Sequence, residues 1–151
     1  MLRSELNDAL KGAMKAKDQQ ALATVRLILA ALKDRDIQAR SSGNADGIDD
    51  QEILEILQKM VKQRREAIVL YEKAGREDLV AREEAEIAVV ERFLPQGLSG
   101  AETEAAVEQA IAEVEAQSIK DMGRVMALLK ERYAGRMEFA KASQMVKQRL
   151  A

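Results

Sequence analysis

The stretch Arg92-Phe93-Leu94-Pro95-Gln96-Gly97-Leu98-Ser99 decides how this chain divides. It contains the only proline of the protein and one of its two phenylalanines. Pro95 cannot donate a backbone N–H and disfavours the α conformation at the preceding residue, so a helix arriving from the N-terminal side must end here. Ser99 is followed three positions later by Glu102, which is the signature of a capping box at the start of a new helix. We therefore expect two helical parts that meet at Pro95.

Apolar residues recur at helical spacing through both parts, and no stretch alternates in the way a strand would. The pattern predicts an all-α fold, with a four-helix N-terminal domain over residues 1–94 and a three-helix C-terminal domain over residues 95–151. A polar loop is expected at 41–47. The expected helices begin at Ser4, run from an Asp18 cap to about Ala39, and then cover Gln51–Ala74 (after a cap at Asp49 or Asp50), Glu77–Phe93, Ala101–Ala116, Ile119–Ala134 and about Phe139–Leu150.

Glycines and one further cap refine this prediction. Gly75 and Gly135 lie where a helix should stop, because glycine adopts the left-handed conformation that closes many helices. Ser118 and Asp121 have the spacing of a second capping box. Gly12 and Gly123 fall inside helical patterns, where glycine costs about 1 kcal/mol relative to alanine. We expect a close helix crossing to be the reason for both.

Composition narrows the classes of function. The 151 residues include no cysteine and no histidine, and the formal net charge is −2. Thiolate metal sites, disulfides and catalysis by histidine are excluded, which makes an enzyme less expected. The carboxylates around Arg82-Glu83-Glu84-Ala85-Glu86 and Glu91 are spread around one helix, so we expect neither a metal nor a cofactor. With no apolar span and no signal-peptide pattern, we expect a cytoplasmic protein.

Charge is distributed unevenly beyond the break. Five glutamates and no basic residue lie between Ser99 and Gln117, whereas eight basic and three acidic residues follow from Ser118 to the end. The basic set predicts contact with nucleic-acid phosphates, and the scarcity of aromatic residues favours folded RNA recognised by shape. The open alternative is an ordinary solvated helix surface. The candidate residues are Lys120, Arg124, Lys130, Arg132, Arg136, Lys141, Lys147 and Arg149.

A second basic run lies on the long helix expected at Gln51–Ala74. Its secondary candidates for nucleic-acid contact are Lys59, Lys62, Arg64 and Arg65. Salt bridges within the helix, such as Lys62 with Glu66, offer a simpler explanation because side chains four positions apart are neighbours. By the same rule Arg82 is expected to pair with Glu86.

The serial order of short motifs resembles the GatB/YqeY family over nearly the whole chain. They are Lys62-Gln63-Arg64-Arg65-Glu66, Ala74-Gly75-Arg76-Glu77-Asp78-Leu79-Val80, Glu83-Glu84-Ala85-Glu86-Ile87, Phe93-Leu94-Pro95-Gln96, Lys120-Asp121-Met122-Gly123-Arg124-Val125-Met126, Gly135-Arg136 and Val146-Lys147. The resemblance implies a four-helix part joined to a three-helix tail like the one that ends the GatB subunit of tRNA-dependent amidotransferase. It also implies tRNA contact through Lys120, Arg124, Arg136 and Lys147. Glu138 departs from the pattern, since aspartate is usual as that cap and glutamate caps less well.

Three functions compete at this point. The first is a non-catalytic tRNA-binding module that assists an amidotransferase or an aminoacyl-tRNA synthetase. The second is a helical protein-interaction adaptor that docks a partner through the 41–47 loop or an apolar face. The third is a carbon–nitrogen ligase with glutamine as amido donor, as the family resemblance suggests. The third requires ATP activation of a carboxylate, for which the chain has no Gly-rich phosphate loop.

Overall fold

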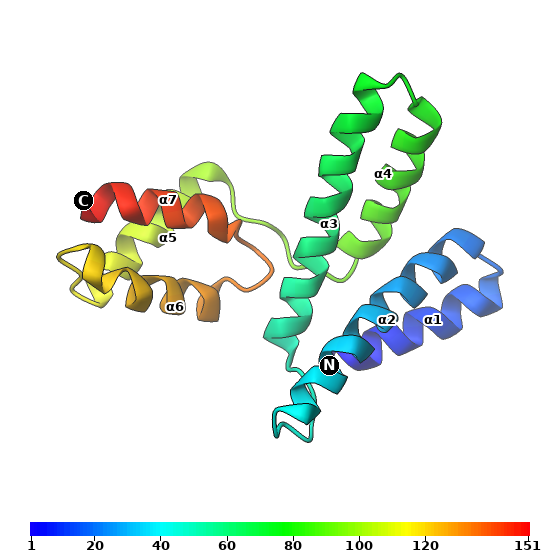
Figure 1. The fold of residues 1–151 in the computed structure, drawn as a ribbon, viewed down its shortest axis with the longest axis horizontal. Coiled ribbons are helices and arrows are strands. Elements are labelled where there is room, and N and C mark those ends of the chain that lie inside the picture. Colours follow the sequence, from blue (N-terminus) through cyan, green and yellow to red (C-terminus); the bar gives the residue numbers. More distant parts are fainter. The chain divides into compact units, whose positions relative to one another are not determined.

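The computed structural model describes all 151 residues, and all of its regular structure is helical (Figure 1). Seven α-helices and one short 3₁₀ helix account for it, with no strand, which confirms the all-α prediction. Contacts between residues group the chain into two compact units, unit 1 (Met1–Leu94) and unit 2 (Pro95–Ala151). No helix combines the length and the apolar character needed to cross a membrane.

Unit 1 consists of two helix pairs. Its helices are α1 (Leu2–Ala16), α2 (Gln19–Ser41), α3 (Asp50–Lys73) and α4 (Glu77–Glu91). Helix α1 lies beside α2, α3 lies beside α4, and α2 packs on α4 to join the pairs (Figure 1). The core between them is aliphatic, and complete burial of one such side chain contributes about 1.5–3 kcal/mol. Fully buried members are Leu6, Ile28, Ile53, Leu57 and Val90.

Local signals set the helix starts in unit 1. The Asp18 carboxylate accepts the backbone N–H of Ala21 at 3.1 Å, and Asp49 accepts that of Glu52 at 2.9 Å. Both expected caps are confirmed, and Asp49, not Asp50, is the N-cap of α3. Gly75 has φ +70°, as expected of a glycine that closes α3. These three positions pair backbone groups that helix ends otherwise leave without a partner.

The connection from α2 to α3 is held by Asp36, whose residue surface is only 6% exposed. Arg3 donates to this carboxylate through both terminal nitrogens, at 2.7 and 2.5 Å, and also to the carbonyl oxygen of Ile48 at 2.8 Å. The Ile48 N–H donates to Asp36 Oδ1 at 2.9 Å. Gly47 has φ +82°, and a Cβ there would clash with the same carboxylate. One buried carboxylate thus fixes α1, α2 and the entry to α3.

Unit 2 is a three-helix arrangement. It contains α5 (Gly100–Glu113), the 3₁₀ helix η1 (Ile119–Asp121), α6 (Met122–Arg132) and α7 (Phe139–Leu150). Each α-helix of the unit contacts the other two. Their shared core includes Val107, Val125, Leu129, Met137 and Val146.

The break at Pro95 separates two hydrophobic cores. Helix α4 ends at Glu91, and the next residues form tighter turns, with Leu94 N–H bonded to the carbonyl of Glu91 at 3.2 Å. Phe93 and Leu94 pack on the core of unit 1, and Leu98 packs on that of unit 2.

The capping box expected after the break is present. Ser99 Oγ accepts the N–H of Glu102 at 3.2 Å, and Glu102 accepts the N–H of Ser99 at 2.9 Å. Backbone and side-chain hydrogen bonds from Ser99 lower the pKa of the Glu102 carboxyl.

Several expected boundaries are corrected. Helix α1 begins at Leu2, so Ser4 lies inside it. Helix α5 ends at Glu113, before the left-handed Glu115 (φ +53°). The helix expected at Ile119–Ala134 is divided into η1 and α6, and α6 ends at Arg132. Helix α7 begins at Phe139 as expected, although the side chain of Glu138 makes no cap hydrogen bond.

The close helix crossing expected at Gly12 and Gly123 is wrong. A Cβ added at either position would have no non-local atom within 4 Å. The loss of helix stability that glycine causes relative to alanine is therefore not offset by packing at these two sites.

Because of this open space, Gly12→Ala and Gly123→Ala are each expected to stabilise the protein by about 0.5–1 kcal/mol. Chemical denaturation measures the change. Gly75→Ala is the control, and it should destabilise because its backbone is left-handed. Loss of stability in Gly12→Ala would contradict the open space at that site.

Asp36 should make unit 1 sensitive to acid. The hydrogen bonds from Arg3 lower the pKa of Asp36 to about 2. Since the folded pKa is depressed, its contribution is complete above the unfolded value near 4 and is lost as pH falls towards 2. We expect this contribution to the free energy of unfolding to be about 1–2 kcal/mol, because solvent screens the interaction at the partly exposed Arg3. Denaturation of wild type and Asp36→Asn between pH 2 and 6 tests this, with exposed Asp34→Asn as control. A pH dependence that is unchanged in Asp36→Asn would rule the assignment out.

Candidate nucleic-acid interface

The structure divides the eight basic candidates of unit 2 into two equal groups. Four make ion pairs with carboxylates of the same unit: Arg124 with Asp121, Arg132 with Glu113, Lys141 with Glu138, and Arg149 with Glu108. The other four make no ion pair, although the charge of Arg136 contributes to lowering the pKa of the Glu102 carboxyl. They are Lys120, Lys130, Arg136 and Lys147. This division could not be read from the net charge of the segment.

Arg124 stabilises the connection between α5 and α6. Its guanidinium donates to Asp121 at 2.8 Å and to the carbonyl oxygen of Val114 at 3.2 Å. Asp121 also accepts the backbone N–H groups of Gln117 and Ser118, and these bonds, with that from Arg124, lower the pKa of its carboxyl. The expected role of Asp121 at a helix start is confirmed. The Arg124 guanidinium therefore donates its hydrogen bonds to groups of the same unit.

Two arginines tie the basic helices to the acidic one. Arg132, at the end of α6, lies 2.6 Å from a carboxylate oxygen of Glu113 on α5. Arg149, on α7, pairs with Glu108 on α5. The hydrogen bond from Arg132 lowers the pKa of the Glu113 carboxyl, and the pair raises the pKa of Arg132. Both arginines are thus engaged in the free protein.

Arg136 is positioned by backbone groups instead. Its Nε donates to the carbonyl oxygen of Gln96 at 3.0 Å, and the carbonyl of Arg136 accepts the N–H of Leu98 at 2.8 Å. Gly135, with φ +78°, makes the turn that brings this residue between α6 and α7. A guanidinium held at Nε keeps its two terminal nitrogens for a second acceptor. No sequence pattern could have revealed the partner 40 positions away.

Three lysines complete the second group. Lys120, Lys130 and Lys147 are exposed, and no carboxylate lies within ion-pair distance of them. Their side chains are therefore solvent-exposed cations without an ion-pair partner.

The secondary candidates on α3 also behave differently from one another. Arg64 has a side chain only 15% exposed, 2.9 Å from Glu86 and 4.0 Å from Glu83 on α4, so it is a structural residue. Arg65 pairs with Glu91 at 3.6 Å. Lys59 and Lys62 are exposed and make no ion pair, so the expected Lys62–Glu66 bridge is wrong. The expected Arg82–Glu86 pair is confirmed at 3.7 Å.

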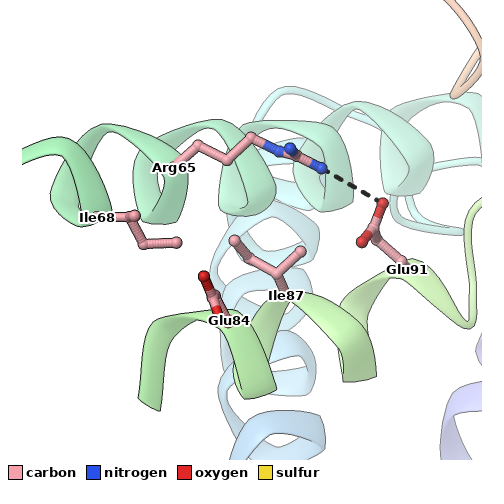
Figure 2. A pocket seen from close by; sticks show the side chains of 5 residues that line it. All are labelled: Arg65, Ile68, Glu84, Ile87 and Glu91. Atoms are coloured by element: carbon pink, nitrogen blue, oxygen red, sulfur yellow. Dashed lines mark ion pairs between the residues drawn. The ribbon is translucent and has the colours of Figure 1, made fainter. Parts of the chain in front are cut away.

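A shallow groove of about 420 Å³ lies between α3 and α4, and sequence reasoning missed it (Figure 2). Ile68 and Ile87 form its apolar part, and the Arg65–Glu91 ion pair closes one end. Glu84 lies on its rim. The one cation that lines the groove, Arg65, is engaged by Glu91.

Comparison with known families places the chain. The profile described as Yqey-like protein matches residues 3–150. The chain belongs to the YqeY-like family. This confirms the YqeY part of the resemblance inferred from the motifs.

Curated relatives of this YqeY-like chain carry the name "Altered inheritance of mitochondria protein 41, mitochondrial". The Lachancea thermotolerans protein is 33% identical over 113 residues, which cover 74% of this chain and 58% of the relative. The Eremothecium gossypii protein is 35% identical over 91 residues, which cover 60% of this chain and 48% of the relative. The Vanderwaltozyma polyspora protein is 34% identical over 89 residues, which cover 59% of this chain and 46% of the relative. The YqeY-like chain thus spans about half the length of the curated relatives it matches.

The expectation of a cytoplasmic protein is corrected by these names, because the relatives are designated mitochondrial. The sequence features used for that expectation, the lack of an apolar span and of a secretory pattern, do not distinguish one aqueous compartment from another.

The contrast between two adjacent arginines of α3 is testable through stability. Arg64→Gln removes the shorter of the two ion pairs of Glu86 and leaves this largely buried carboxylate with only the exposed Arg82 at 3.7 Å, so we expect a loss of about 1–3 kcal/mol. Arg65→Gln removes an exposed pair and should cost less than about 0.5 kcal/mol. Urea denaturation of the two variants provides the comparison, and equal losses would contradict the structural role of Arg64.

Proposed function

We propose that this chain is a non-catalytic tRNA-binding module that assists tRNA-dependent amidation or aminoacylation. Membership in the YqeY-like family and the motif resemblance to the tail of GatB support the proposal. In it, residues 95–151 are the tRNA-contacting domain and residues 1–94 are a separate helical domain. The covalent chemistry is then carried out by a partner enzyme: amide formation by an amidotransferase, or ester formation between amino acid and tRNA by an aminoacyl-tRNA synthetase.

The observation that carries the proposal is the position of Arg136. Its Nε is fixed by the carbonyl of Gln96, while its terminal nitrogens remain for an acceptor. Guanidinium groups bind phosphate through two parallel hydrogen bonds, and a guanidinium that is already oriented loses less conformational freedom on binding. Arg136 is also one of the residues for which the family resemblance implies tRNA contact.

The exposed lysines of unit 2 extend this contact. Lys120, Lys130 and Lys147 lie on the same three-helix unit as Arg136 and have no carboxylate partner. Phosphate contacts of this type release counterions, so affinity should fall linearly with the logarithm of salt concentration. Only two phenylalanines and two tyrosines occur in the whole chain, so base stacking contributes little and the contact is to the backbone of a folded RNA.

A binding titration with total tRNA across a salt series tests the proposal. Arg136→Gln combined with Lys147→Gln should weaken binding by about tenfold or more and reduce the salt slope by roughly 1 for each lost phosphate contact. The matched control is Arg26→Gln with Lys33→Gln, two exposed cations of α2 without ion-pair partners. It changes the net charge equally and should leave the slope unchanged.

Arg136→Lys separates geometry from charge in the same titration, and it should retain the salt slope but lose part of the affinity. Absence of wild-type binding at about 50 mM salt would overturn the proposal. The adaptor function would then be the better explanation, with the groove between α3 and α4 as its first candidate surface.

A further inference from the structure

Helix α5 is unlike the other helices of the protein in its charge. It carries acidic side chains and no basic ones, and two of its carboxylates bind arginines from the basic helices. Glu113 holds Arg132 of α6 at 2.6 Å, and Glu108 holds Arg149 of α7. The sequence analysis counted both arginines as candidates for RNA contact, whereas the structure gives them an acidic partner inside the same unit.

We infer that α5 is an internal competitor of RNA: Glu108 and Glu113 occupy the guanidinium groups of Arg149 and Arg132 and thereby lower the affinity of unit 2 for phosphate chains. This inference rests on the proposed function, because it concerns the same surface. It assigns a role to the acidic helix that neither the fold nor the family match requires.

Carboxylate and phosphate use the same donors of a guanidinium. Both present paired oxygens to the planar fork of N–H groups, so an arginine engaged by one loses donors for the other. Glu113 holds one terminal nitrogen of Arg132, and Glu108 holds one terminal nitrogen of Arg149. A phosphate that binds both terminal nitrogens of either guanidinium therefore competes with that carboxylate for one of them. The carboxylate left behind also lies close to the incoming phosphate and repels it.

The two ion pairs are accessible enough to be exchanged. The side chains of Arg132 and Glu113 are 41% and 38% exposed, and those of Arg149 and Glu108 are 35% and 63% exposed. Exposed ion pairs contribute little to folding, and the helices have an apolar core of their own. Removal of the two carboxylates should therefore leave unit 2 folded and free both arginines.

Helix α5 and its C-terminal end offer a matched control. Glu104 and Glu115 are exposed and lie within ion-pair distance of no basic residue. Glu104→Gln with Glu115→Gln removes the same two charges as Glu108→Gln with Glu113→Gln, but it releases no arginine. Any general effect of lower negative charge is thus common to both double variants.

The experiment measures binding of total tRNA and of inorganic polyphosphate to wild type and to both double variants at several salt concentrations. We expect the Glu108→Gln/Glu113→Gln protein to bind about threefold to tenfold more tightly than the control variant. The gain should disappear when Arg132→Gln and Arg149→Gln are added, since the freed guanidiniums are its cause. Circular dichroism establishes that each variant is folded.

The outcomes separate this inference from the function on which it rests. Equal affinities of the two double variants would overturn the competition, while salt-dependent binding by wild type would leave the tRNA-binding proposal standing. Binding only by the Glu108→Gln/Glu113→Gln protein would support the competition and overturn tRNA binding by wild type. No binding by any variant to either polyanion would overturn both.

Discussion

The buried carboxylate of Asp36 is the interaction on which the arrangement of unit 1 depends. It receives hydrogen bonds from Arg3 near the chain start and from the backbone of Ile48 just before α3. Hydrophobic contacts are not directional, so they bring helices together without choosing one register. A carboxylate with three donors at fixed angles makes that choice, and Gly47 is present because no side chain fits beside it.

Arginine and lysine have different tasks in this protein. Arginines join helices: Arg3 to Asp36, Arg64 to Glu86, Arg132 to Glu113 and Arg149 to Glu108. Among the lysines only Lys141 makes an ion pair, and it does so within its own helix start. The planar guanidinium suits fixed bidentate contacts, whereas the hydrated ammonium remains in solvent. A count of positive charges therefore overstates the cations available to an RNA.

Local sequence signals predicted the fold well because each acts within a few residues. The Asp18, Asp49 and Ser99 caps and the Gly75 stop are present, whereas α6 already ends at Arg132 and Gly135 lies in the turn that follows it. The errors arise where the deciding contact is distant or absent, as with the glycines expected at helix crossings.

The candidate site shows the same limit. Arg64 and Arg65 are neighbours in sequence, but about 100° of helix rotation buries one against α4 and leaves the other in an exposed pair with Glu91. The contact of Arg136 with Gln96 likewise joins residues 40 positions apart. The domain division at residues 94 and 95 stays a prediction as regards independent folding.

The ion pairs that join α5 to the basic helices have a kinetic consequence. Residues 95–151 carry as many carboxylates as cations, so seen from beyond a Debye length, about 10 Å at 0.1 M salt, unit 2 presents little net field. A polyanion is therefore not drawn towards it from a distance. Association proceeds at the rates of unsteered partners, on the order of 10⁵–10⁶ M⁻¹s⁻¹, and depends only weakly on ionic strength. Under the proposed tRNA-binding function, discrimination among RNAs would lie in how long each complex lasts, because only an RNA whose phosphates meet the few free cations at close range would be retained.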